Sequence, residues 1–267
     1  MVYESIGSQP WSWAGKTSSE VREIAERDGS VLVVPIGSIE QHGNHMPVAT
    51  DTILVDAVAQ HAAERVASDV PILVTPPVWS GYSPHHMPFG GTITLEFDDM
   101  LDIVEEIADS ALDNGFDSLL LLNGHGGNGP LVDSATSTIG TEQPQAEVLG
   151  LTYFQLAASF VDDVRDTEIG GMAHAGEFET SLMLHLRPEL VKEDRMEGTM
   201  MDEPYPQSTK DLVVGGPLSV YRDFTEYSAS GAIGDPTAAS AAKGERILEL
   251  LCDELEDVLS RMHERNK

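Results

Sequence analysis

The run VLVVPIG at residues 31–37 holds no polar side chain. A strand with one face in water alternates apolar and polar residues, whereas an unbroken apolar run is typical of a strand covered on both faces. The run Ser118–Leu122 is the most apolar strand candidate of the chain and follows the same pattern. These two segments therefore predict a buried sheet of the parallel type.

Predicted helices alternate with predicted strands along the rest of the sequence. The residues Thr17-Ser18-Ser19-Glu20 form a capping box, which predicts a helix from there to about Arg27. Further helices are predicted at residues 52–67, 97–114, 129–139, 178–186 and 236–264, and further strands at residues 72–75 and 147–152. This alternation implies an α/β fold with a mostly parallel sheet covered on both faces.

The segment 195–235 is rich in Gly, Pro and Ser, and we expect it to be irregular. No internal repeat, low-complexity linker or break in composition divides the sequence. We therefore expect residues 1–267 to form a single domain.

The charge of the chain excludes several classes of partner. Its 267 residues include 15 Lys and Arg against 45 Asp and Glu, which gives a formal net charge of −30. Nucleic-acid backbones and anionic membrane surfaces both require basic patches, so neither is an expected partner. Apolar residues make up 41% of the chain, which is enough for a core and predicts a globular protein instead of a disordered one.

The same charge is similar to that of proteins from extreme halophiles. Self-repulsion of this size destabilises a compact chain unless concentrated salt screens it. We therefore favour a halophilic source over an ordinary acidic protein.

The single cysteine, Cys252, excludes a disulfide framework and any metal site built from cysteines. Residues 1–13 lack the basic and apolar regions of a signal peptide, and the longest apolar runs are too short to span a bilayer. We expect a soluble, cytoplasmic protein.

Four segments carry the residues suited to chemistry, and the first, EQHGNHMP at 40–47, directly follows the predicted strand at 31–37. Ligands of parallel sheets bind beyond the carboxyl ends of strands. Glu40 and His42 are two residues apart and point the same way in an extended segment, while Asp51 opens the next helix, whose dipole favours a carboxylate. Carboxylates and imidazole together suit Zn²⁺, Mn²⁺ or Fe²⁺. A polar loop with Asp51 as a plain helix-start residue is the alternative.

The second segment, NGHGGN at 123–128, begins at the end of the most apolar strand. Its glycines let the backbone turn sharply, so His125 emerges at the carboxyl end of that strand as a candidate ligand. A phosphate-binding loop and a plain strand-to-helix turn are the alternatives. The spacing is not G-x-G-x-x-G, and no Lys or Arg lies between Arg65 and Arg165, which argues against phosphate.

The third segment, GGMAHAGEFETS at 170–181, places His174 in a glycine-rich loop and Glu179 at the start of an apolar helix. A carboxylate on a helix and a nearby histidine suit a metal ligand and a general acid/base. A capping arrangement is the alternative, and it suits Glu177 better than His174.

The fourth segment, SGYSPHHMPFGGT at 80–92, has the Gly, Pro and His content of a loop that covers a substrate. A surface loop with incidental histidines is the alternative. Six of the nine histidines, at positions 42, 45, 85, 86, 125 and 174, lie in the four segments, and surface histidines placed at random would not cluster in this way.

In their order and in their residues, these segments resemble those of the creatininase (creatinine amidohydrolase) family. The resemblance covers roughly residues 10–260. It rests on residues 35–43 (PIGSIEQHG) with Met46-Pro47 and Thr50-Asp51, residues 91–95 (GTITL), residues 123–128 (NGHGGN), and residues 174–176 (HAG) with 179–183 (ETSLM). It implies a three-layer α/β/α fold, a dinuclear centre of Zn, Mn or Fe, and a homohexamer. With the charge, it suggests a member from a halophilic archaeon.

The resemblance also implies roles for single residues. Glu40, Asp51 and His125 match the ligands of one metal ion. His42 matches a ligand of a second ion, and Asp51 bridges the two. Glu179 matches a buried acid beside the centre, and we expect it to complete the second site and to take part in catalysis, although Glu177 stays open for that place.

His174 matches the acid/base histidine of the family. Creatininase carries Tyr-Glu where this chain has Gly126-Gly127, and that Glu is a metal ligand there, so a ligand role for Glu179 is more necessary here. We expect the substrate to contact Ser83, His86, Gly126 and Gly127.

The resemblance implies a small amide substrate, namely creatinine, which water opens to creatine, or a related cyclic amide. A hydroxide activated by the two metals would attack the carbonyl, and His174 would pass a proton to the leaving nitrogen. Creatininase gates its substrate with tryptophans that this chain lacks after Trp79. A formamide deformylase of flavin or deazaflavin synthesis and a mycofactocin-type peptidase are therefore alternatives, and a metal- or ligand-binding sensor is the non-enzymatic one.

Overall fold

The computed structural model describes residues 3–7, 9–202 and 204–267, and four parallel strands form its central sheet. The strands are β1 (Val31–Ile36), β2 (Ile72–Val74), β3 (Ser118–Asn123) and β4 (Glu147–Thr152). Their order across the sheet is β2-β1-β3-β4, and every neighbouring pair is parallel. The predicted parallel sheet is confirmed.

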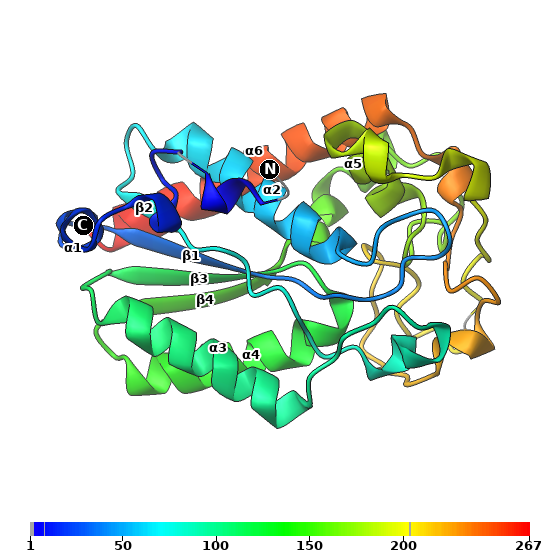
Figure 1. Ribbon diagram of the computed structural model, residues 1–267, viewed down its shortest axis with the longest axis horizontal. Coiled ribbons are helices and arrows are strands. Elements are labelled where there is room, and N and C mark those ends of the chain that lie inside the picture. The colour runs from blue at the N-terminus through cyan, green and yellow to red at the C-terminus, as the bar shows by residue number, and fades with distance from the viewer. Residues whose placement is uncertain (1–2, 8, 203) are drawn as a thin grey trace.

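Helices cover both faces of this sheet, as Figure 1 shows. One layer holds α2 (Thr50–Val66), α5 (Glu177–Leu186) and α6 (Ala241–Arg265). The other holds α3 (Phe97–Leu112) and α4 (Gly129–Glu142), and α1 (Ser18–Ala25) packs into the same core. The expected three-layer α/β/α architecture is confirmed.

The two cores explain why the strands are apolar throughout. Successive side chains of a strand point to opposite faces. In β1, Val31 and Val33 pack beneath α2, α5 and α6, whereas Leu32, Val34 and Ile36 pack against α1, α3 and α4. A polar residue at any of these positions would be buried, so the run is unbroken.

Helix boundaries follow the predicted ones closely, with one larger difference. The capping box at Thr17 is present, with the Thr17 amide donating to the Glu20 carboxylate at 2.7 Å. The closing helix, expected from residue 236, begins only at Ala241. Pro236–Ala238 form a separate 3-10 turn, and the extended Ser240 accepts a hydrogen bond from the Lys243 amide, which caps α6.

The segment predicted to be irregular contains only short turns and isolated bridges in its described residues. One bridge joins Thr199 to Ile233, and the Ile233 amide donates to the His174 carbonyl at 2.8 Å. This segment therefore lies against the loop that carries His174. Among the described residues, no helix has the length and apolar character needed to cross a membrane.

The strand order decides where a site can form. From β1 the chain moves outward to β2 on one side, and from β3 it moves to β4 on the other. The loops after these two central strands therefore diverge and leave a crevice at their carboxyl ends, the usual ligand position in α/β sheets.

Candidate metal centre

The five side chains expected to be metal ligands meet at this crevice. Glu40 and His42 follow β1, His125 follows β3, Asp51 lies in the first turn of α2, and Glu179 lies in the first turn of α5. None is more than 4% exposed. Residues distant in the sequence thus share one buried polar pocket.

Glu40, Asp51 and His125 form the first group of converging ligand atoms. His125 Nδ1 lies 2.9 Å from Glu40 Oε2 and 3.2 Å from Asp51 Oδ2. One ligand atom from each residue lies within 4.8 Å of the others, which is close enough to share one ion.

His42, Asp51 and Glu179 form a second such group. His42 Nε2 lies 3.0 Å from Asp51 Oδ1 and 3.9 Å from Glu179 Oε1. Asp51 therefore directs one carboxylate oxygen to each group, as a residue bridging two ions would. Glu177, the open alternative, is bound to Lys243 instead and belongs to neither group.

The donor atoms fit divalent metal ions. His42 Nε2 and Asp51 Oδ2 are buried, and neither has a hydrogen-bond partner among the described residues. Buried polar atoms without partners are costly, and coordination would satisfy both. Imidazole nitrogens mixed with carboxylate oxygens suit Zn²⁺, Mn²⁺ and Fe²⁺.

Electrostatics of the pocket also favour positive charge. Burial alone lowers the pKa of His125, but the carboxylates of Glu40 and Asp51 outweigh it and raise that pKa to about 10. The pKa of His42 shifts in the same direction. Burial lowers it, but Asp51 and Glu179 outweigh burial and raise it well above the usual value. The carboxylates therefore stabilise positive charge between them, which divalent ions would supply.

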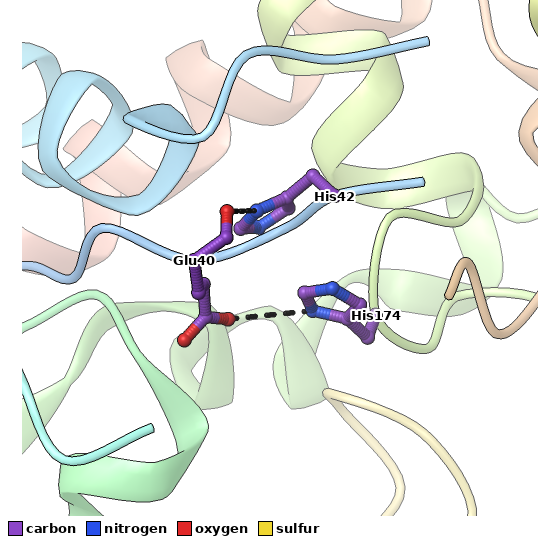
Figure 2. A group of neighbouring side chains, drawn as sticks. All are labelled: Glu40, His42 and His174. Atoms are coloured by element: carbon purple, nitrogen blue, oxygen red, sulfur yellow. Dashed lines mark hydrogen bonds and ion pairs between the residues drawn. The ribbon is translucent and has the colours of Figure 1, made fainter. Parts of the chain in front are cut away.

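His174 lies beside both groups without joining either. Figure 2 shows its ring next to Glu40 and His42, with Nδ1 3.6 Å from Glu40 Oε1. The His42 and His174 rings are 4.3 Å apart between centroids. Glu40, His42 and His174 also form a third set of potential ligand atoms within 4.8 Å of one another.

The tautomer of His174 follows from its other nitrogen. Nε2 lies 2.7 Å from the Gln41 carbonyl oxygen, which can only accept, so Nε2 carries a hydrogen. Burial, reinforced by the charge on His42, holds the pKa of His174 well below its usual value. A neutral ring then leaves the Nδ1 lone pair facing Glu40.

Three of the four expected substrate contacts lie against the predicted metal ligands. The buried Ser83 hydroxyl donates to Glu40 Oε2 at 2.7 Å, and His86 Nε2 lies 3.2 Å from Glu40 Oε1. A Cβ at Gly127 would lie 2.4 Å from His125 Nε2, so a side chain at residue 127 would clash with the imidazole ring in its present position. These contacts orient Glu40 and His125, while substrate binding by these residues stays a prediction.

Gly126, the fourth, borders a cavity of about 510 Å³ that reaches His174. The cavity lies between the loops after β3 and β4 and the irregular segment. Its apolar walls include Phe154, Leu212, Val213, Phe224 and Ile233. Among the described residues, no Lys or Arg lines the cavity. The one carboxylate among them that does, Asp211, is bound by Arg165 and backbone amides.

Phe224 and Tyr153 are site residues that sequence reasoning missed. The Phe224 ring lies 4.3 Å from that of His86 and 5.2 Å from that of His174, centroid to centroid. Its signal was the capping box Asp223–Glu226, which marks an ordered turn inside the irregular segment. Tyr153 directly follows β4, and its buried hydroxyl has no hydrogen-bond partner among the described residues. Burial, with the nearby charges of Glu179 and Asp51, raises the pKa of Tyr153 well above its usual value.

Comparison with known proteins adds to this geometry. Residues 14–259 match the family model described as Creatininase: Creatinine amidohydrolase. The chain belongs to the creatininase family. A solved structure described as Creatininase Mn has a TM-score of 0.79 and 28% identity, covering 93% of this chain and 97% of that chain.

Two creatininase-family relatives differ in what they act on. The chain is 34% identical to the mycofactocin precursor peptide peptidase of Mycobacterium tuberculosis (strain ATCC 25618 / H37Rv), over 84% of this chain and 82% of that protein. It is 30% identical to the creatinine amidohydrolase of Pseudomonas putida, over 86% and 88%. The chain is a creatininase-family hydrolase, and the family name alone does not identify its substrate.

Proposed function

We propose that this chain hydrolyses a C–N amide bond with two divalent ions held by Glu40, His42, Asp51, His125 and Glu179. One observation carries the proposal: two sets of ligand atoms converge on the two oxygens of Asp51. Three protein ligands at each ion would leave coordination positions open, as catalytic sites require.

When bound, such ions lower the pKa of water toward neutrality and polarise a carbonyl oxygen. The chain supplies the rest. Its buried carboxylates and imidazoles fix the ligand geometry in a pocket with little solvent. The Ala175 amide donates to Glu179 Oε2 at 2.7 Å, which orients that carboxylate.

His174 is the residue placed to move a proton. Its Nε2–H is fixed on the Gln41 carbonyl, so Nδ1 is the atom that takes a proton from the attacking water and returns it to the leaving nitrogen. His174 borders both the ligand cluster and the cavity, which supports a leaving group that occupies the cavity. A sensor would need no such group, which favours an enzyme.

Creatinine, opened to creatine, is the first substrate to test, together with related cyclic amides. The cavity favours a second candidate, a longer formamide or peptide-type amide. About 510 Å³ lies in the usual range for drug-sized ligands and exceeds what a single small ring needs. The similarity to a mycofactocin peptidase supports the same choice.

The homohexamer, the cytoplasmic location and the halophilic source are further parts of this proposal. The first is suggested by the family, and the last by the net charge of −30. None of them is needed for the chemistry at the centre.

The experiment is hydrolysis by protein loaded with Zn²⁺, Mn²⁺ or Fe²⁺, in dilute buffer and in multi-molar KCl. Creatine, formate and a new peptide amine would be measured from creatinine, an N-formyl amine and a short peptide amide. Turnover of any one that disappears in Asp51→Asn supports the proposal. Binding of two ions with hydrolysis of none of the three substrates would contradict the proposal.

A further inference from the structure

Glu177 is a fully buried acid in the first turn of α5 that the metal centre does not use. Its carboxylate accepts hydrogen bonds from the Asp166 amide at 2.8 Å and the Thr167 amide at 3.1 Å. The Thr167 hydroxyl and the Lys243 ammonium also donate to it. Two residues away, Glu179 faces the metal ligands, so α5 presents its two acids to different partners.

Lys243 reaches this site from α6, and its side chain is only 9% exposed. Besides Glu177, its ammonium contacts Asp166 Oδ2 at 2.7 Å and the Ala238 carbonyl oxygen at 2.8 Å. Three acceptors match its three hydrogens. Because the pair is buried, salt screens it far less than the exposed Arg246–Glu249 pair on the same helix.

Glu177 closes the loop that carries His174. Its side chain binds the start of the loop at residues 166–167, and its amide donates to the Gly171 carbonyl at 3.1 Å. The segment from Asp166 to Glu177 is therefore tied back on itself. Among the described residues, Lys243 is the cationic partner of the carboxylate that holds this closure.

The loop needs such support because part of its backbone is unfavourable. Ala175, next to His174, has a φ of 56°, a region that residues other than glycine rarely adopt. Backbone of this kind persists only where its surroundings hold it. A Cβ at Gly176 would lie 2.4 Å from the Gly171 oxygen, so the turn is also tightly folded.

We propose that the Glu177–Lys243 ion pair is a positioning device for His174. It fixes the loop from α6, and no side-chain hydrogen bond or ion pair among the described residues joins it to the predicted metal ligands. The inference rests on the proposed function only where it concerns turnover, since the loop geometry stands by itself.

The first test is amide hydrogen exchange followed by mass spectrometry. Lys243→Met keeps the length of the side chain but leaves a buried carboxylate unpaired. We expect exchange in residues 166–176 to rise at least about tenfold, because an unpaired buried charge favours local opening. Arg246→Met, one turn further along α6, removes an exposed partner and should leave that exchange unchanged. Equal exchange in both variants overturns the proposal.

A double variant covers the case in which Lys243→Met fails to fold. Glu177→Gln with Lys243→Met removes both charges, and the glutamine oxygen can still accept from residues 166–167. We expect this protein to fold, with loop exchange between those of the wild type and Lys243→Met. Exchange as slow as in the wild type overturns the need for the ion pair.

Kinetics then separate positioning from general stability. On any substrate that the wild type turns over, the double variant should lose about 10- to 100-fold in kcat, with KM and metal content within about twofold. A loss confined to the unfolding temperature, with kcat unchanged, contradicts the positioning role. If the wild type hydrolyses nothing while loop exchange responds as expected, the proposed function fails and the loop support stands.

Discussion

His42 Nε2 lies 3.0 Å from Asp51 Oδ1, and this nitrogen has no hydrogen-bond partner among the described residues. The two side chains come from the loop after β1 and the first turn of α2, and both are buried. The short distance pairs an imidazole with a carboxylate in a buried place. The other Asp51 oxygen faces His125, so one carboxylate joins both halves of the site.

Asp51→Asn tests this joint role directly. An amide keeps the size of the side chain but removes the charge and one oxygen ligand, so we expect both ions to be lost and turnover to fall by about 10³-fold or more. Metal content by plasma mass spectrometry and rates on the same sample measure this. Asp56→Asn, on the same helix and bound to backbone amides of residues 4–5, is the control and should keep both ions.

Glu179→Gln and Glu177→Gln distinguish the two acids of α5. Glu179 Oε1 lies 3.9 Å from His42 Nε2, whereas Glu177 is bound to Lys243. We expect Glu179→Gln to retain one ion per subunit and Glu177→Gln to retain two, as titrated calorimetrically. The reverse stoichiometry would assign the second site to Glu177.

The His174→Ala variant should keep its metal ions and lose most of its catalytic rate. His174 donates to the Gln41 carbonyl and lies beside the ligand groups, so removal of the ring removes proton transfer without removing a predicted ligand. The expected fall in kcat is about 10²- to 10⁴-fold, the usual contribution of general acid–base catalysis. Loss of an ion in this variant would show instead that His174 is a ligand.

Gly127→Ala and Gly126→Ala form a matched pair in one loop. A Cβ at residue 127 would lie 2.4 Å from His125 Nε2 and 2.6 Å from the Tyr82 oxygen, while one at residue 126 meets nothing within 4 Å. We expect about 10- to 100-fold weaker metal binding in the first variant, as for other disturbed ligand supports, and no change in the second. Equal affinities would mean that the His125 ring is free to move aside.

The stability of the metal-free protein should fall between pH 6.5 and about 4. Burial, helped by the charge on His42, lowers the pKa of His45 to about 4. In that window the unfolded chain binds a proton and the folded protein does not, so the free energy of unfolding decreases as pH falls, by about 3 kcal/mol for this group. Urea unfolding at several pH values should show a weaker dependence for His45→Gln, and identical slopes would contradict this.

Much of the site was predictable because its ligands follow strand ends. Glu40, His42 and His125 stand directly after unbroken apolar runs, and parallel strands deliver whatever follows them to one edge. The glycines around His125 marked the turn. By contrast, Phe224 comes from a segment without periodicity, and the turn that carries it is fixed by its own capping box.

By itself, the sequence determined the layers, the parallel sheet and the identity of the ligand-bearing segments, since these depend on local periodicity and on order along the chain. Only the tertiary structure decided which acid of α5 faces the centre. Glu177 and Glu179 are two positions apart on one helix, so about 200° of rotation separates them. Lys243, brought by α6 from 66 residues away, holds the first, and His42 and Asp51 lie beside the second. Such long-range pairing leaves no local pattern, because it arises from how the helices pack.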